Sequence, residues 1–285
     1  MIRPFTYAGR GRVSRFATAA AATVAAALAL TVAGAADSHH AVPPPPANPT
    51  SADQIQNIDQ VKTAIRAYYG DTPTTVVDPV PNDVDGGDKL LHTFSPTSAY
   101  AAEMAGVVDE AEKYLRKPNN GDHPSTGATK AVLFDVDDTL LNTFEYEIYS
   151  SFVFNPATQA FFVDAAIFPP VPHMVDLEHF AEAQGYTVFF LTGRGIAQHD
   201  GTLANLTGVG YDVVDANLYL KDNSASWLSS CAPSCTTVQY KSLTRQHIES
   251  LNYDIVANFG DQFSDLTGGF ANKTFKLPNP MYFLP

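Results

Sequence analysis

Residues 131–142 read AVLFDVDDTLLN, an unbroken apolar run that ends in a group of acidic residues. Such a run suits a strand buried on both faces, as in a parallel sheet covered by helices. Because a strand alternates its faces, Asp135 and Asp137 emerge on one side just where the strand opens into a loop. Two carboxylates there are costly unless they are paired or bind a cation. The stretch predicts a buried strand that ends in a functional site; the alternative is a helix N-cap at Asp138 or Thr139 beside solvated acids.

Three further apolar runs follow the same pattern, each bounded by turn or helix signals. They are TVFFL (187–191), ANLYL (216–220) and DIVANF (254–259), and helical patterns over 174–183 and 243–251 lie between runs. This alternation predicts an α/β fold, a three-layer Rossmann-like parallel sheet flanked by helices. In such folds ligands bind beyond the carboxyl ends of the strands, so the polar residues that follow each run are the candidates for function.

Candidate residues do follow these runs. Thr192 and Gly193 come after the second run, and their hydroxyl and freely approachable N–H groups suit phosphate oxygens. The fourth run ends in GDQFSD (260–265), which brings Asp261 and Asp265, while Lys241 precedes the helix that leads into that run. Taken singly, each has an ordinary explanation, because a Thr often caps a helix and a Lys is usually a surface charge.

The sequence before this sheet is organised differently. Helical spacing of apolar residues predicts amphipathic helices over about 55–69 and over 98–115, which form an N-terminal helical extension. Between them, residues 71–87 are rich in Pro, Asp and Gly and indicate an irregular crossing. We therefore expect the folded domain to span residues 55–285.

The first 35 residues have the pattern of a signal peptide. Four arginines precede an Ala-rich apolar run over 16–32, and Ala33-Gly34-Ala35 supplies the small residues of a cleavage site near Ala36. The alternative is a retained membrane anchor, for which a 17-residue run is at the lower limit of length. We predict export, no stable membrane association after cleavage, and a Pro-rich linker over 36–54.

Charge and cysteine content fit an exported protein. Loss of the four arginines changes the formal net charge from −13 to −17, so nucleic acid is not an expected partner. A phosphate-binding site in so acidic a chain needs local positive charge from a metal ion, a few cations and backbone N–H groups. Cys231 and Cys235 predict a disulfide in an oxidising compartment, and a zinc site is disfavoured because no close His pair follows. The sequence carries no signal for an oligomeric state.

Taken together, DxDxT at 135–139, Thr192, Lys241 and GDxxxD at 260–265 resemble the four motifs of the haloacid dehalogenase-like superfamily. The stretches FFLTGR (189–194), VQYKSLTRQHIESLNYDIVANFGDQFSDL (238–266) and TFKLPNPMYF (274–283) are similar to its class B-like acid phosphatases, including the plant vegetative storage proteins. The resemblance runs from about residue 98 to the last residue. It implies a Mg²⁺-dependent acid phosphatase that hydrolyses small phosphomonoesters through a phospho-aspartate.

The resemblance also implies the role of each residue at the site. Asp135 would be the nucleophile, and Asp137 the acid and base, kept protonated at mildly acidic pH by its like-charge neighbour. Thr192, Gly193 and Lys241 would bind the phosphate. Mg²⁺ would be bound by the side chains of Asp135 and Asp261 and by the main-chain carbonyl of Asp137. Asp265 would contact the ion either directly or through another ligand of the ion.

Residues 142–172 are expected to form a small cap-like insertion after the first catalytic strand. We expect most of the aromatic residues in this segment to lie in the core, and one or two to stack on an aromatic or nucleoside leaving group. These aromatic residues are Phe144, Tyr146, Tyr149, Phe152, Phe154, Phe161 and Phe162.

Three alternatives compete with a phosphatase. A response-regulator receiver is disfavoured by the DxD doublet and the expected export. A dehalogenase or phosphotransferase on the same scaffold stays open, and so does a non-catalytic storage or binding protein. The presence of Asp135 disfavours the last, because the related proteins without activity lack the nucleophile.

Overall fold

The protein is described here by a computed structural model, which covers residues 48–55, 57–117 and 127–284. The predicted signal peptide and most of the Pro-rich linker lie outside these residues. Within them, no helix combines the length and the apolar character needed to cross a lipid bilayer.

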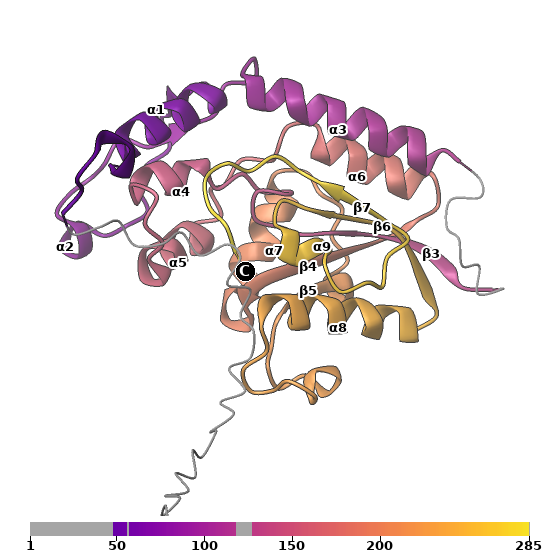
Figure 1. Cartoon of the computed structure of the whole chain (residues 1–285). Helices are drawn as coiled ribbons and strands as arrows, with labels where there is room; N and C mark the ends of the chain where they lie inside the picture. The colour runs from indigo at the N-terminus through magenta and orange to yellow at the C-terminus, as the bar shows by residue number, and fades with distance from the viewer. Residues whose placement is uncertain (1–47, 56, 118–126, 285) are drawn as a thin grey trace, which may run out of the picture. The chain divides into compact units, whose positions relative to one another are not determined.

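A five-stranded parallel sheet forms the centre of the fold (Figure 1). Its strand order is β5-β4-β3-β6-β7, so the strand that carries the first acidic motif is central. A second sheet pairs β1 with β2 in antiparallel fashion. The strands are β1 (Thr72–Pro73), β2 (His92–Thr93), β3 (Thr129–Phe134), β4 (Thr187–Gly195), β5 (Leu218–Lys221), β6 (Tyr253–Gly260) and β7 (Lys273–Lys276).

The sheet is covered on both faces, as its unbroken apolar runs predict. Val132 and Phe134 of β3 face one hydrophobic core, while Ala131 and Leu133 face the other. Helices α3 and α6 cover the first face and α8 covers the second (Figure 1). The predicted three-layer α/β architecture is confirmed.

Most predicted helices form where their sequence signals place them, with differences at the ends. Helix α3 begins after Ser98, whose hydroxyl accepts a hydrogen bond from the N–H of Ala101, and α1 begins after the Asn57 cap. The helices are α1 (Ile58–Tyr69), α2 (Asn82–Asp85), α3 (Ala99–Leu115), α4 (Phe144–Tyr149), α5 (Pro156–Asp164), α6 (Met174–Ala183), α7 (His199–Gly208), α8 (Thr237–Ser250) and α9 (Phe263–Leu266).

Helix α8 begins six residues before the predicted range, so the expectation that Lys241 precedes this helix is wrong. Thr236 and Gln239 form a capping box in which each side chain bonds the other's main-chain N–H. The capping box fixes the start of the helix and places Lys241 in its second turn. The ammonium group thereby projects from a rigid element.

The N-terminal extension packs on the same core as the sheet. The Tyr69 ring at the end of α1 stacks on Phe144 with ring centroids 4.5 Å apart and lies 4.4 Å from the Tyr100 ring of α3. Residues 71–87 are largely irregular, as predicted, apart from the short β1 and α2. The segment 142–172 contains α4 and α5, and its role as a cap stays a prediction.

Candidate active site

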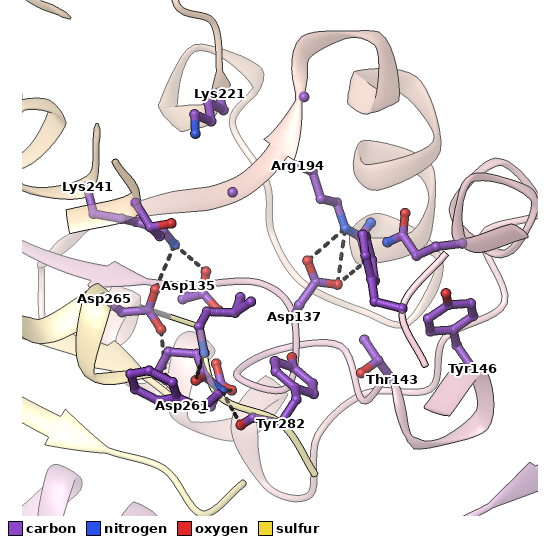
Figure 2. Close-up of a pocket in the computed structure, with 18 of the residues that line it drawn as sticks. Asp135, Asp137, Thr143, Tyr146, Arg194, Lys221, Lys241, Asp261, Asp265 and Tyr282 are labelled. Carbon is purple, nitrogen blue, oxygen red and sulfur yellow. Dashed lines mark hydrogen bonds and ion pairs between the residues drawn. The ribbon is translucent and has the colours of Figure 1, made fainter. Parts of the chain in front are cut away.

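The site lies beyond the carboxyl ends of β3, β4 and β6. Asp135 directly follows β3, Arg194 lies at the end of β4, and Asp261 directly follows β6. All three line a cavity of about 390 Å³, together with Lys241 from α8 (Figure 2). The sheet thus brings together residues up to 126 positions apart in the chain, as the strand-end rule predicts.

Lys241 joins two buried carboxylates. Its ammonium donates a hydrogen bond to Asp135 Oδ1 and another to the carbonyl oxygen of Leu191 at 2.6 Å, and it lies 3.1 Å from Asp265 Oδ1 (Figure 2). Burial tends to lower the pKa of Lys241, but the charges of Asp135 and Asp265 outweigh it and the pKa is raised. The lysine is therefore a permanent cation against Asp135.

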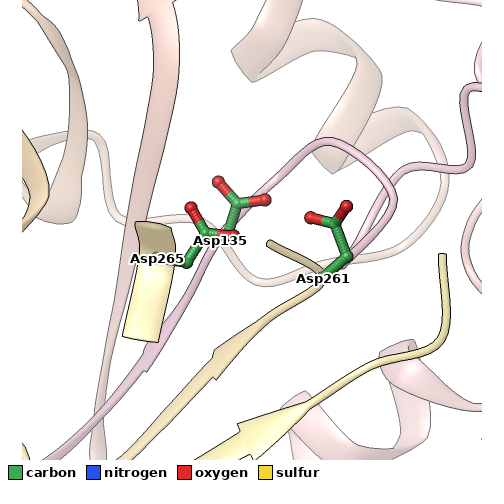
Figure 3. Close-up of side chains that lie close together, drawn as sticks. All are labelled: Asp135, Asp261 and Asp265. Atoms are coloured by element: carbon green, nitrogen blue, oxygen red, sulfur yellow. The ribbon is translucent and has the colours of Figure 1, made fainter. Parts of the chain in front are cut away.

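Asp135, Asp261 and Asp265 form a compact acidic cluster (Figure 3). All three are buried, and each offers an oxygen within 4.8 Å of the others'. Burial and then the charge of Asp265 raise the pKa of Asp135 well above its usual range, and the same two causes raise the pKa of Asp261 to about 8. When all three are ionised, a single lysine leaves them with an excess of negative charge. Their oxygen donors fit a hard divalent cation such as Mg²⁺.

Asp137 has a different environment from Asp135, although the two are only two residues apart. Its carboxylate lies outside the acidic cluster and pairs with the guanidinium of Arg194, with Oδ1 2.7 Å from Nη2 and Oδ2 3.1 Å from Nε (Figure 2). Arg194 also donates to Thr202 Oγ1 at 3.0 Å. The Asp137 carboxylate therefore faces a cation rather than the acidic cluster, and its role as acid and base stays a prediction.

Comparison with known proteins agrees with this geometry. The family model of the HAD (haloacid dehalogenase-like) superfamily, subfamily IIIB (acid phosphatase), matches residues 91–285, more than half of the chain. The chain belongs to this acid phosphatase family. The membership confirms the resemblance seen in the motifs and makes the protein a phosphoric monoester hydrolase.

Curated and solved relatives of this acid phosphatase are consistent with the assignment. Acid phosphatase 1 of Solanum lycopersicum is 32% identical over 190 residues, which cover 65% of this chain and 69% of that one. Vegetative storage protein 1 of Arabidopsis thaliana is 31% identical over 159 residues, and the match spans only 55% of its length. The class C acid phosphatase from Bacillus anthracis shares the fold, with a TM-score of 0.51 and 22% identity over 64% of this chain and 80% of that one.

Of the predicted phosphate-binding residues, Gly193 lines the cavity and Lys241 reaches into it. Thr192 lies within β4 and is fully buried, and its Oγ1 accepts a hydrogen bond from the N–H of Arg194 at 3.1 Å. This contact occupies one acceptor site of the Thr192 hydroxyl, whose role on phosphate stays a prediction.

The alternative interpretation of Asp138 as a helix cap is wrong, because the next helix begins only at Phe144. Asp138 instead closes the loop: its carboxylate accepts hydrogen bonds from the N–H of Thr143 at 2.9 Å and from the hydroxyl of Tyr282 at 2.7 Å. Burial raises the pKa of Asp138 to about 7, although the bonds from Thr143 and Tyr282 lower it. This carboxyl ties the loop that follows β3 to Tyr282, close to the end of the described residues.

The acid phosphatase cavity has one acidic side and one largely apolar side. Its apolar wall comes from the predicted cap and from residues close to the end of the chain: Tyr146, Phe152, Phe154, Tyr282, Phe283 and Leu284. Phe154 is two-thirds exposed, so an aromatic surface stands at the cavity mouth. Part of the aromatic content of 142–172 therefore faces the cavity, whereas Phe144 and Phe162 are fully buried in the core.

Sequence reasoning missed several polar residues of the site. Arg194 follows the predicted Thr192 and Gly193 directly, and its place at a strand end was a signal that could have identified it. Gln262 and Asn279 each donate to Asp261 Oδ2, at 2.6 Å and 2.7 Å. Asn279 is 18 residues beyond Asp261, and no spacing rule connects the two.

Proposed function

We propose that this protein is an exported, Mg²⁺-dependent acid phosphatase that hydrolyses small phosphomonoesters through a phospho-aspartate on Asp135. The observation that carries the proposal is the contact of the buried Asp135 carboxylate with the Lys241 ammonium in the cavity lining. Such a contact holds a nucleophile in one orientation and places a cation where a phosphate dianion must approach. Export is supported by the signal-peptide pattern and by the disulfide between Cys231 and Cys235.

In the first step, a carboxylate oxygen of Asp135 attacks phosphorus and the ester oxygen leaves. At acidic pH Asp137 carries a proton and gives it to that oxygen, so the leaving group departs as an alcohol. Lys241 offsets the charge of the phosphoryl oxygens throughout, together with the N–H of Gly193.

In the second step, water attacks the phosphorus of the phospho-aspartate. Asp137, which gave up its proton in the first step, takes the proton of this water, and its contact with Arg194 holds the carboxylate in place. The bond between phosphorus and Asp135 breaks, which releases inorganic phosphate and restores the carboxylate.

The residues proposed to hold Mg²⁺ are Asp135, the main-chain carbonyl of Asp137, and Asp261, with Asp265 in contact directly or through water. The bound ion would supply positive charge that offsets repulsion between the substrate dianion and this acidic cluster. Lys241 already contacts the cluster and Arg194 also lines the cavity, so the ion would add to the positive charge there.

The decisive test measures phosphate release from a panel of phosphomonoesters by secreted protein, with Mg²⁺ and with excess chelator. Asp135→Asn should lose turnover, while Asp109→Asn, the same change at an exposed site on α3, should keep it. Chelation should abolish turnover and added Mg²⁺ restore it. Full activity in chelator would remove the metal from the mechanism, and no activity on any ester would favour the non-catalytic storage protein. An intact mass that begins near Ala36 would confirm export processing.

A further inference from the structure

The chain returns to the site after its last strand. Residues 277–284, here called the strap, leave β7 at the carboxyl end of the sheet and curve round this end, as the yellow segment in Figure 1 shows. Leu277 donates its N–H to the carbonyl of Gly260 at 2.9 Å, the residue before Asp261. The side chains of Leu277 and Met281 are buried, so the strap is anchored at two points.

Between these anchors, Asn279 points its amide at the acidic cluster. Its Nδ2 donates to Asp261 Oδ2 at 2.7 Å, and its Oδ1 accepts the N–H of Met281 at 2.8 Å. The two ends of the amide have different partners, which fixes its orientation. Pro278 and Pro280 restrict the backbone on both sides, so little conformational freedom is lost when the contact forms.

A second amide on the same oxygen also depends on the strap. Gln262 Nε2 donates to Asp261 Oδ2 at 2.6 Å, and Gln262 Oε1 in turn accepts the N–H of Leu284 at 2.9 Å. Asp261 Oδ2 thus carries two hydrogen bonds. Among the described residues, Asp261 Oδ1 has one contact, a long one of 3.4 Å with the hydroxyl of Thr139.

We propose that Asn279 is a positioning residue that turns Asp261 so that Oδ1, and not Oδ2, binds the divalent cation. The proposal rests on the metal site of the proposed function and adds a source of metal affinity in the strap. Hydrogen-bond partners of metal ligands orient the ligand, and their loss commonly reduces metal affinity by about 10- to 100-fold.

The chain offers a matched control for this contact. Asn272 Nδ2 donates to Asp254 Oδ1 at 2.8 Å, the same chemical pair between the same two segments. This pair lies at the amino ends of β6 and β7, whereas Asn279 and Asp261 lie beyond their carboxyl ends. Replacement of Asn272 therefore removes an amide-to-carboxylate hydrogen bond of similar length and leaves the contacts of the acidic cluster unchanged.

The test is a titration of the secreted, full-length protein with Mn²⁺, followed by the electron paramagnetic resonance signal of the free ion. Asn279→Leu should raise the Mn²⁺ dissociation constant by about 10- to 100-fold, and Asn272→Leu should leave it unchanged. Asn279→Ser keeps an oxygen for the Met281 N–H but is too short to reach Asp261, so it should weaken Mn²⁺ binding with the turn preserved.

The outcomes separate the two proposals. Wild-type affinity in Asn279→Ser would overturn the positioning role while leaving the metal site in place. No Mn²⁺ binding by the wild type would overturn the metal site, and the inference with it. Equal weakening in Asn272→Leu would show a general loss of structure and would also contradict the proposal. Unfolding in chelator should be similar for the Asn272 and Asn279 variants.

Discussion

Replacement of Lys241 by methionine should destabilise the protein strongly, because it leaves buried carboxylates without their cation. Methionine keeps most of the side-chain volume and removes the charge. Lys241 is 2% exposed and contacts both Asp135 and Asp265. Removal of one partner from a buried ion pair typically costs about 3–5 kcal/mol in the free energy of unfolding. We expect a loss in that range at pH 7.5 in chelator.

The size of this loss should depend on pH and on metal. Burial already raises the pKa of Asp135 well above its usual range, and loss of the lysine raises it further. A carboxyl whose pKa is higher in the folded state than in the unfolded state binds a proton more tightly when the protein is folded. The free energy of unfolding is therefore highest at low pH and falls as the pH rises through the two pKa values. The variant should therefore be less impaired at pH 5 than at pH 7.5, and Mg²⁺ should restore part of its stability.

Urea unfolding followed by the fluorescence of Trp227 measures these effects. Lys113→Met is the control, because that exposed lysine pairs with Asp109 on the surface of α3 and should change stability by no more than about 0.5 kcal/mol. A loss below about 1 kcal/mol in Lys241→Met, or a loss that is the same at both pH values, would refute the electrostatic reasoning.

Three further changes test other parts of the structure. Arg194→Lys cannot keep the two-point contact with Asp137, so kcat/KM should fall by on the order of 10²-fold in steady-state assays. Normal activity would contradict the role of Arg194 in positioning Asp137. Burial raises the pKa of Glu178 to about 7, so ionisation of this side chain lowers the free energy of unfolding as the pH rises from about 4.5 to 7. Thermal unfolding of Glu178→Gln should show a gain of about 1–3 kcal/mol at pH 8 and none at pH 4.5; equal effects would exclude this titration. Reduction of the Cys231–Cys235 bond should lower stability by no more than about 2 kcal/mol in urea, and a larger loss would mean that the bond holds more than its own short loop.

Much of the sheet was predictable from sequence because burial on both faces leaves an unbroken apolar run. The runs at 131–136, 187–191 and 254–259 correspond to β3, β4 and β6. The rule that ligands bind beyond the carboxyl ends of the strands correctly predicted that Asp135 and Asp261 lie in one site. β7 was missed. It has four residues, Lys-Thr-Phe-Lys, and lies at the sheet edge, so its single apolar side chain, Phe275, forms no continuous apolar run.

The contacts that orient the site were less predictable, since they depend on tertiary placement rather than on local pattern. Asn279 reaches Asp261 only because β7 returns the chain to the end of the sheet. Arg194 turns toward Asp137 rather than to solvent because Thr202 of α7 holds its other side. Lys241 was expected before its helix, although Thr236 and Gln239 gave a capping signal that would have placed it correctly.

The role of Asp135 as the phosphoryl acceptor can be measured by intact mass after a rapid acid quench with p-nitrophenyl phosphate, whose good leaving group needs little protonation. Asp137→Asn should still phosphorylate Asp135 but lack the base for hydrolysis, so the mass of one added phosphoryl group should accumulate. Asp135→Asn should show none and should lose turnover. Phosphate on the Asp135→Asn protein, or unchanged activity in it, would show that another residue is the nucleophile.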